Sequence, residues 1–262
     1  MEASENVSES YGGGLALFEG DGIATQLRVE SLLARSNSSV SGGGIAVNWG
    51  MLTALEAQLV SNTASTLGGG VYANSSGVTL ADAVLSGNYA SSGGGGAVVE
   101  GVLSLPGAQI VANSAAVDGG GVASTASTLD LTGAELAGNM ALGRGGAVFE
   151  SHLAPESPSV IRLYSSLTVT GNYANYGAGF WSNIRTVIED SVITGNHAWL
   201  EGGGYFFEAG DGDMAGIGTT IAGNFALQPP SANLWWCEST QCCGEYVLAA
   251  DGNYVDEGCL SR

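Results

Sequence analysis

Six carboxylates in the second half of the chain have the chemistry needed for acid–base catalysis. They are Glu150, Glu189, Asp190, Glu208, Asp211 and Asp213, and Arg162 and Arg185 lie among them. Two carboxylates at a suitable separation can divide the acid and base roles of glycoside hydrolysis. The sequence therefore permits a carbohydrate-active enzyme, either a polysaccharide lyase or a glycoside hydrolase. In that case the acids of residues 150–164 and 208–213 should converge with an arginine in a groove.

Metal binding is a second chemistry that these residues could support. Asp211-Gly212-Asp213 resembles a fragment of a calcium loop, but the twelve-residue spacing of an EF-hand is missing. His152 and His197 have no partners at the spacing of zinc ligands. We therefore expect no metal ion or other cofactor. If calcium does bind, Glu208, Asp211 and Asp213 are the candidate ligands.

A recurring asparagine indicates which elements must position these groups. Its copies are 24 to 33 residues apart. Most copies have an aliphatic residue three positions before, a small residue directly before, Ala or Ser two positions after, and a glycine cluster beyond. A period of this length indicates one supersecondary unit stacked on copies of itself. A stacked Asn can donate its amide to the neighbouring coil, so we interpret these residues as structural corners: Asn37, Asn62, Asn88, Asn113, Asn139, Asn172, Asn196 and Asn224.

Each repeat contains three short runs with the alternation and the bounding residues of β-strands. Within residues 68–93 these runs are 70–73, 78–80 and 83–86. The sequence therefore predicts an all-β fold, a right-handed single-stranded parallel β-helix, which is a solenoid. We expect about eight coils of about 25 residues, with three short strands in each, spanning residues 1–227.

The C-terminal residues depart from the repeat. They hold all four cysteines of the chain, Cys237, Cys242, Cys243 and Cys259. Paired cysteines are typical of an oxidising compartment. The adjacent Cys242 and Cys243 are not expected to bond to each other, which leaves two connectivities. We predict that residues 228–262 form a disulfide-stapled cap on the open end of the solenoid.

The residue directly after the corner Asn distinguishes one repeat from the next. Large side chains occupy this column at Tyr89, Met140, Tyr173, His197 and Phe225. Stacked along a solenoid, they would either shield the corner or form an apolar strip that docks a protein or stacks on sugars. This column is the candidate binding site.

The charge balance limits the possible partners. The chain has 25 Asp and Glu, six Arg and no Lys, which gives a formal net charge of −19. Phosphate backbones require clustered cations, so nucleic acid is excluded as a partner. No run of about 18 apolar residues is present, so we expect no membrane-spanning helix. The N-terminus lacks the apolar segment of a signal peptide, although the cysteines indicate secretion, so we expect the chain to be part of a longer protein.

The glycine clusters carry a resemblance to a known family. Gly95-Gly96-Ala97-Val98 and Gly145-Gly146-Ala147-Val148 match the GGA[ILV] motif of the polymorphic outer membrane proteins. The FxxN motif of that family is altered here, because Leu, Ile or Val replaces Phe three residues before the Asn. The repeats thus resemble those of secreted right-handed parallel β-helices of the pectin-lyase-like type. The resemblance implies an extracellular or cell-surface location.

We therefore expect a secreted or cell-surface structural or adhesive module that is not catalytic and that binds a surface protein or a glycan along one face. Adjacent acids in consecutive repeats, which an enzyme built on the repeat would need, are not evident. The alternative remains the carbohydrate-active enzyme described above.

Overall fold

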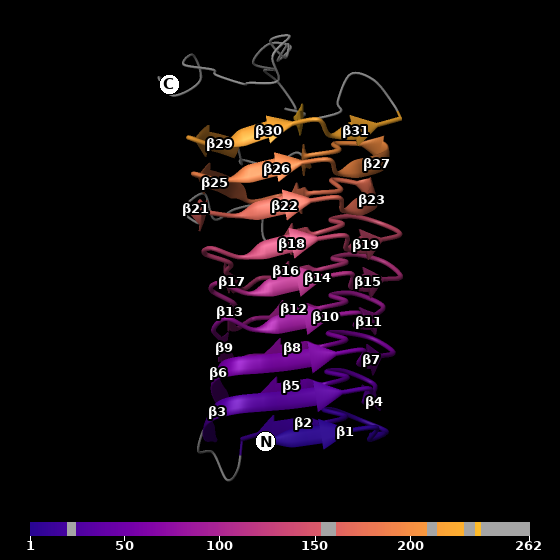
Figure 1. The fold of residues 1–262 in the computed structure, drawn as a ribbon, viewed down its shortest axis with the longest axis vertical. Coiled ribbons are helices and arrows are strands. Elements are labelled where there is room, and N and C mark those ends of the chain that lie inside the picture. Colours follow the sequence, from indigo (N-terminus) through magenta and orange to yellow (C-terminus); the bar gives the residue numbers. More distant parts are fainter. Residues whose placement is uncertain (20–24, 153–160, 209–213, 228–233, 237–262) are drawn as a thin grey trace.

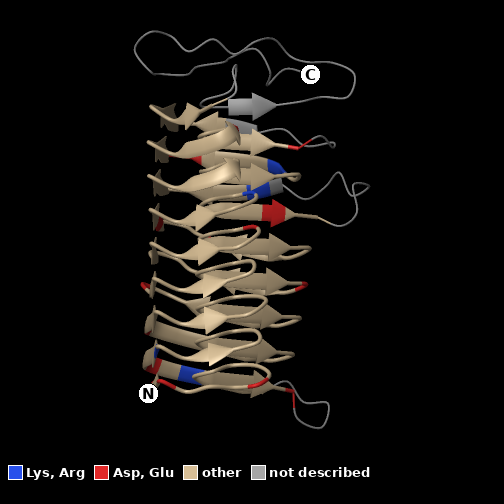
Figure 2. Cartoon of the chain, turned by 90° about the vertical axis from the view of Figure 1, so that its right-hand side faces the viewer, with Lys and Arg blue, Asp and Glu red and all other residues tan. Residues whose placement is uncertain are grey.

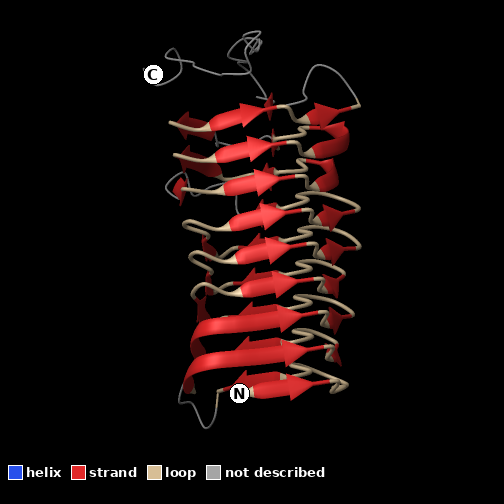
Figure 3. Ribbon diagram, in the orientation of Figure 1, coloured by secondary structure: helices blue, strands red, loops and turns tan. Residues whose placement is uncertain are grey.

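The chain folds as a parallel β-solenoid, which confirms the predicted fold class (Figures 1 and 3). The computed structural model describes residues 1–19, 25–152, 161–208, 214–227 and 234–236. These residues form 32 strands and no helix, and each strand runs parallel to the strands with which it pairs in the stack. The right-handed winding stays a prediction from the sequence.

Two of the four sheets carry the strands that precede the corner Asn. The twelve-stranded sheet contains β1 (Glu2–Ser4), β3 (Gln26–Arg35), β6 (Met51–Val60), β9 (Gly77–Leu80), β10 (Val84–Ser86), β13 (Val102–Ser104), β14 (Gln109–Val111), β17 (Thr128–Asp130), β18 (Glu135–Ala137), β22 (Thr168–Thr170), β26 (Val192–Thr194) and β30 (Thr220–Ala222). The three-stranded sheet contains β21 (Ile161–Ser165), β25 (Arg185–Glu189) and β29 (Met214–Ile217).

The other two sheets carry the strands that follow the corner Asn and the glycine cluster. The eight-stranded sheet contains β4 (Ser38–Ser39), β7 (Thr63–Ala64), β11 (Tyr89–Ala90), β15 (Ser114–Ala115), β19 (Met140–Ala141), β23 (Tyr173–Tyr176), β27 (His197–Glu201) and β31 (Phe225–Ala226). The nine-stranded sheet contains β2 (Leu15–Phe18), β5 (Ile45–Asn48), β8 (Val71–Asn74), β12 (Gly96–Val99), β16 (Val122–Thr125), β20 (Val148–Ser151), β24 (Phe180–Ser182), β28 (Tyr205–Phe207) and β32 (Leu234–Trp236). Strand β32 pairs with β28 and lies within the residues expected to form the cap.

The strand pattern within a coil differs from the expectation in two ways. A two-residue strand, such as β11, follows the corner Asn in addition to the three expected runs. In the early coils, the second and third runs join into the ten-residue strands β3 and β6. Later coils turn at this point, because Asp82 and Gly107 adopt positive φ angles of 51° and 67° that end the extended conformation.

The corner asparagines form one continuous hydrogen-bonded ladder. Asn113 Oδ1 accepts from the backbone N–H of Asn88 at 3.0 Å and from its Nδ2 at 2.9 Å. Asn113 Nδ2 donates to Asn139 Oδ1 at 3.0 Å and to the Leu85 carbonyl at 2.8 Å. The same side-chain donation links each corner Asn to the next, from Asn6 to Asn224. All eight predicted corner residues therefore occupy equivalent, buried positions.

The backbone conformation explains why a small residue usually precedes each corner Asn. The residue at this position adopts the left-handed backbone conformation in every coil, with φ between 53° and 65°, as in Gly87, Ala112 and Gly138. Side chains other than glycine are strained in this conformation, and glycine is not. The column of small residues therefore marks a reversal of the chain that lets Asn enter the ladder.

The interior is filled by side chains in register from coil to coil. Leu85, Ile110 and Leu136 stand three residues before successive corners, pair directly and are fully buried. A second cluster lies on the outside of the nine-stranded sheet, where Phe149 and Trp181 stack at 4.7 Å between ring centroids. The side chains of this cluster, which extends from β5 to β28, are therefore buried although they lie outside the solenoid interior.

Candidate functional site

The predicted column of large side chains is exposed and in register. In the eight-stranded sheet, Met140 pairs with Tyr173, Tyr173 with His197, and His197 with Phe225. Ala residues alternate with them and point inward, so the large side chains all lie on the outer face. Four of the five predicted binding residues thus form one unbroken row.

Tyr89 stands apart from this row. Its partners in register are Thr63 and Ser114, so a small polar side chain lies on each side of it. Tyr89 is as exposed as the others, at 45%. It belongs to the same column but not to the same apolar surface.

The rings of the row face each other along the stack. The rings of Tyr173 and His197 are stacked, with centroids 5.3 Å apart and an interplanar angle of 16°. The Phe225 ring lies 5.8 Å from the His197 ring, at 42°. Tyr173 and His197 therefore each cover one face of the other's ring, whereas the Phe225 ring is tilted away from a stacked arrangement.

A second apolar column runs beside the first, and the sequence prediction missed it. It consists of the residues three positions after the corner Asn, of which Leu142, Trp199 and Leu227 are large and apolar. Trp199 shares β27 with His197, and the alternation of a strand places both on the outer face. We call the surface formed by both columns over the last four strands of this sheet the ladder face: Met140, Leu142, Tyr173, Asn175, His197, Trp199, Phe225 and Leu227.

The ladder face carries no carboxylate and no arginine. Its six large apolar residues are between 41% and 60% exposed. From β4 to β31, neither column contains Asp, Glu or Arg at any coil. Charged residues return only five positions after the Asn, where Asp118 pairs with Arg144 and where Glu201 ends β27. Figure 2 looks onto this side of the molecule, where red and blue segments are few and scattered.

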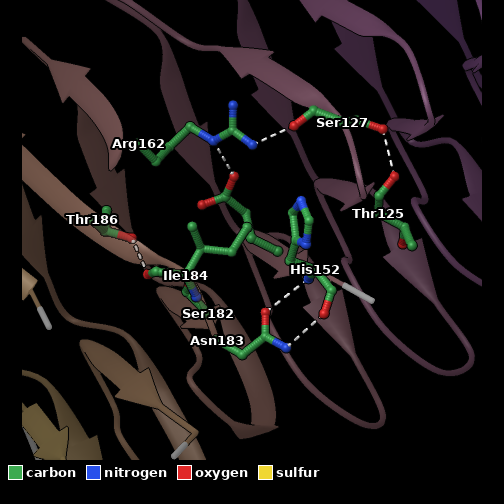
Figure 4. A network of polar contacts seen from close by, with 9 residues as sticks. Thr125, Ser127, His152, Arg162, Ser182, Asn183, Ile184 and Thr186 are labelled. Atoms are coloured by element: carbon green, nitrogen blue, oxygen red, sulfur yellow. Dashed lines mark hydrogen bonds and ion pairs between the residues drawn. The ribbon is translucent and has the colours of Figure 1, made fainter. Parts of the chain in front are cut away.

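The acids proposed for catalysis converge only in part. Glu150 and Arg162 do meet, with Arg162 Nε 2.9 Å from Glu150 Oε1, and both side chains are buried. The guanidinium of Arg162 also donates to the Ser127 carbonyl (Figure 4). Register places Thr186 rather than Glu189 beside Arg162. Glu189 therefore does not supply a second carboxylate to this pair.

A depression of about 330 Å³ opens beside the buried pair, lined among others by Glu100, Ser127, His152 and Arg162. The backbone of His152 is held by Asn183, which accepts from its N–H at 2.8 Å and donates to its carbonyl at 3.3 Å (Figure 4). Burial raises the pKa of Glu150, and the charge of Arg162 offsets this only in part. Arg162 lines the depression, whereas Glu150, which is fully buried behind the ion pair, does not.

The remaining predicted acids are distributed elsewhere. Glu208 lies 3.6 Å from Arg144, which is bound more closely by Asp118 at 2.8 Å and lies over the Trp181 ring at 4.5 Å. Arg185 begins β25 and Glu189 ends it, so the strand separates them by about 13 Å. Asp190 follows Glu189 at a left-handed turn, with φ of 47°.

Several predictions fall on residues outside the described part of the chain. These are the candidate calcium ligands Asp211 and Asp213 and the four cysteines, Cys237, Cys242, Cys243 and Cys259. Among the residues that are described, no three His, Cys, Asp or Glu side chains are grouped to hold a metal ion. That part of the chain also contains no helix long and apolar enough to span a membrane.

Comparisons with known proteins add nothing to this picture. No family model, no curated protein and no solved structure matches the chain. The ladder face and the buried Glu150–Arg162 pair are therefore interpreted from their own geometry.

Proposed function

We propose that the chain is a secreted or cell-surface structural and adhesive module, not an enzyme, that docks a protein on the ladder face. The observation that carries this proposal is an exposed, mainly apolar surface without carboxylates or arginines, on a chain with a net charge of −19. Contiguous exposed apolar patches on soluble proteins mark interaction sites. The rigid stack of the solenoid fixes the spacing of the side chains that make this patch.

The orientation of the rings favours a protein over a glycan. Sugars stack on the faces of aromatic rings, but the faces of Tyr173 and His197 are turned to each other. Ring edges and aliphatic groups, such as those of Leu142 and Leu227, suit the apolar side chains of a protein partner.

The arrangement of the acids supports a non-catalytic role. Hydrolysis of a glycosidic bond by the usual mechanism requires two carboxylates on either side of the substrate. Glu150 is instead bound to Arg162 in the interior, and Glu208 is bound to Arg144 at the surface. Glu208 shares Arg144 with Asp118, but both oxygens of Asp118 are engaged by that guanidinium.

Adhesion of coated beads tests the proposal. Beads carrying the chain are applied to cell monolayers, and attachment is counted for the wild type and for the double variant Tyr173→Ser/Phe225→Ser. Tyr89→Ser is the matched control, because it removes an equally exposed ring of the same column outside the ladder face. Circular dichroism verifies that each variant is folded.

We expect the double variant to lose most attachment and the Tyr89 variant to retain it. Pre-treating the cells with protease should abolish attachment, whereas glycosidase should leave it intact. Unchanged attachment by a folded double variant would remove the ladder face as the binding site. Loss of attachment after glycosidase alone would replace the protein partner by a glycan.

A further inference from the structure

We infer that the partner on the ladder face is a second copy of this chain, packed face to face about a two-fold axis. This inference rests on the proposed function, because it names the partner of the same surface. An isologous contact of this kind needs one surface that is complementary to itself. A mainly apolar sheet face without carboxylates or arginines meets that condition.

The placement of the charges is the first argument for a like partner. The net charges of two copies repel each other, but the ladder face itself is free of carboxylates. A foreign partner of opposite charge would be drawn to the carboxylates on the other surfaces of a chain with net charge −19. A second copy carries the same excess of carboxylates, and burying them unpaired would oppose contact. The ladder face lets two copies meet while their acids stay in water.

The regular spacing of the face is the second argument. Successive coils place the side chains of Met140, Tyr173, His197 and Phe225 in directly paired positions, at the spacing of about 4.8 Å between strands. A two-fold related copy presents ridges at the same spacing. Ridges of one copy can therefore fit between those of the other along the whole row, which a partner of another architecture would not offer.

The size of the face is the third argument. Phe, Tyr and Trp side chains bury roughly 150–250 Å² each, so the three aromatic residues at about half exposure offer on the order of 300 Å². Met140, Leu142 and Leu227, which are between 44% and 60% exposed, add to this area. A standard interface buries about 800 Å² per partner, and weak or transient contacts bury less. The ladder face is therefore large enough for a reversible dimer.

Sedimentation velocity of the full chain tests the inference directly. The wild type is examined from roughly 5 to 200 µM, a range that suits a weak contact, at low and at high salt. We expect the weight-average sedimentation coefficient to rise with concentration, and to rise further at high salt because salt screens the repulsion between the copies.

Variants locate the contact. Trp199→Ser/Leu227→Ser should remain monomeric across the range, and Leu142→Ser provides a second, smaller change on the same face. Tyr89→Ser should associate as the wild type does. Circular dichroism and the unfolding midpoint show that the variants keep the fold, since each replaced side chain is exposed.

The outcomes separate this inference from the proposed function. A wild type that is monomeric at every concentration overturns the inference, and so does a Trp199/Leu227 variant that still associates. If the wild type stays monomeric but its beads still attach to cells, and protease treatment of the cells abolishes this attachment, the face docks a different protein. In that case the proposed function stands and only the identity of the partner is wrong. If the variant loses self-association and also loses bead attachment to cells that display the chain, both stand.

Discussion

Replacing Asn113 with Ala should remove one rung of the ladder that joins the coils. The Asn113 side chain takes part in four hydrogen bonds: two that it accepts from Asn88 and two that it donates, to Leu85 and Asn139. All of these groups are buried, with Asn88, Asn113 and Asn139 no more than 1% exposed. Water therefore cannot replace the lost partner.

The expected loss follows from the groups left without a partner. The substitution leaves the backbone N–H of Asn88 and one hydrogen of its side-chain amide without an acceptor, and it removes one donor from the Leu85 carbonyl. A buried polar group left unpaired costs about 1–3 kcal/mol. We expect Asn113→Ala to lower the free energy of unfolding by about 3–6 kcal/mol, which is in the upper tail for single substitutions.

Urea unfolding monitored by circular dichroism measures this loss, with Asn6→Ala as the matched control. Asn6 makes the same donation, to Asn37 at 2.9 Å, but it is exposed at the end of the stack. Its loss should cost less than about 1 kcal/mol, because water can hydrate the groups left behind. Hydrogen exchange at the Asn88 amide should accelerate in the Asn113 variant alone. Equal, small effects of both substitutions would refute the view that the ladder stabilises the stack.

Three further predictions concern the backbone and the buried pair. Ala112→Gly should raise the free energy of unfolding by about 0.5–1 kcal/mol in the same urea assay, because Ala112 has a φ of 53° and glycine is unstrained there. The reverse change, Gly138→Ala, should lower the free energy of unfolding by a similar amount, because an added Cβ meets nothing within 4 Å and only the backbone strain remains. Gly94→Ala should cost more than about 3 kcal/mol or prevent folding, because its Cβ would lie 2.4 Å from backbone oxygens of the next coil that cannot move aside; a cost near that of Gly138→Ala would contradict the close stacking. Burial raises the pKa of Glu150 above its ordinary 4.5, so its contribution to stability is complete below that pH and is lost as pH rises through the raised pKa. The unfolding midpoint of Glu150→Gln, measured relative to that of the wild type, should therefore rise as the pH increases from 4.5 through the raised pKa. A difference between the two midpoints that stays constant with pH would contradict the raised pKa.

The repeat itself was predictable because it is fixed by backbone constraints. The ladder requires Asn, the left-handed position before it favours glycine, and close stacking excludes a Cβ at positions such as Gly94. Each constraint recurs in every coil and so leaves a column in the sequence. The two-residue strand after the Asn left no such signal, because two residues show no periodicity.

The ladder face was predictable only in its first column. Trp199 lies two residues after His197, and the other members of its column lie two residues after those of the first column. If a strand had been expected after the Asn, the alternation of side chains would have predicted that both columns lie on the same face. The pairing of Glu150 with Arg162 was not predictable in the same way, because the residues between them break the repeat and its register. Sequence spacing could bring these acids near an arginine but could not show that the pair is internal.

Bead attachment by two double variants tests most directly whether binding resides on the ladder face or at the buried pair. Tyr173→Ser/Phe225→Ser alters the ladder face, and Glu150→Met/Arg162→Met replaces the internal pair by apolar side chains, a change that buried ion pairs tolerate when both partners are removed. We predict that attachment falls at least about tenfold, or by about 1.4 kcal/mol, in the first variant and is unchanged in the second. Attachment that survives the first change and is lost with the second, in folded proteins, would contradict the assignment.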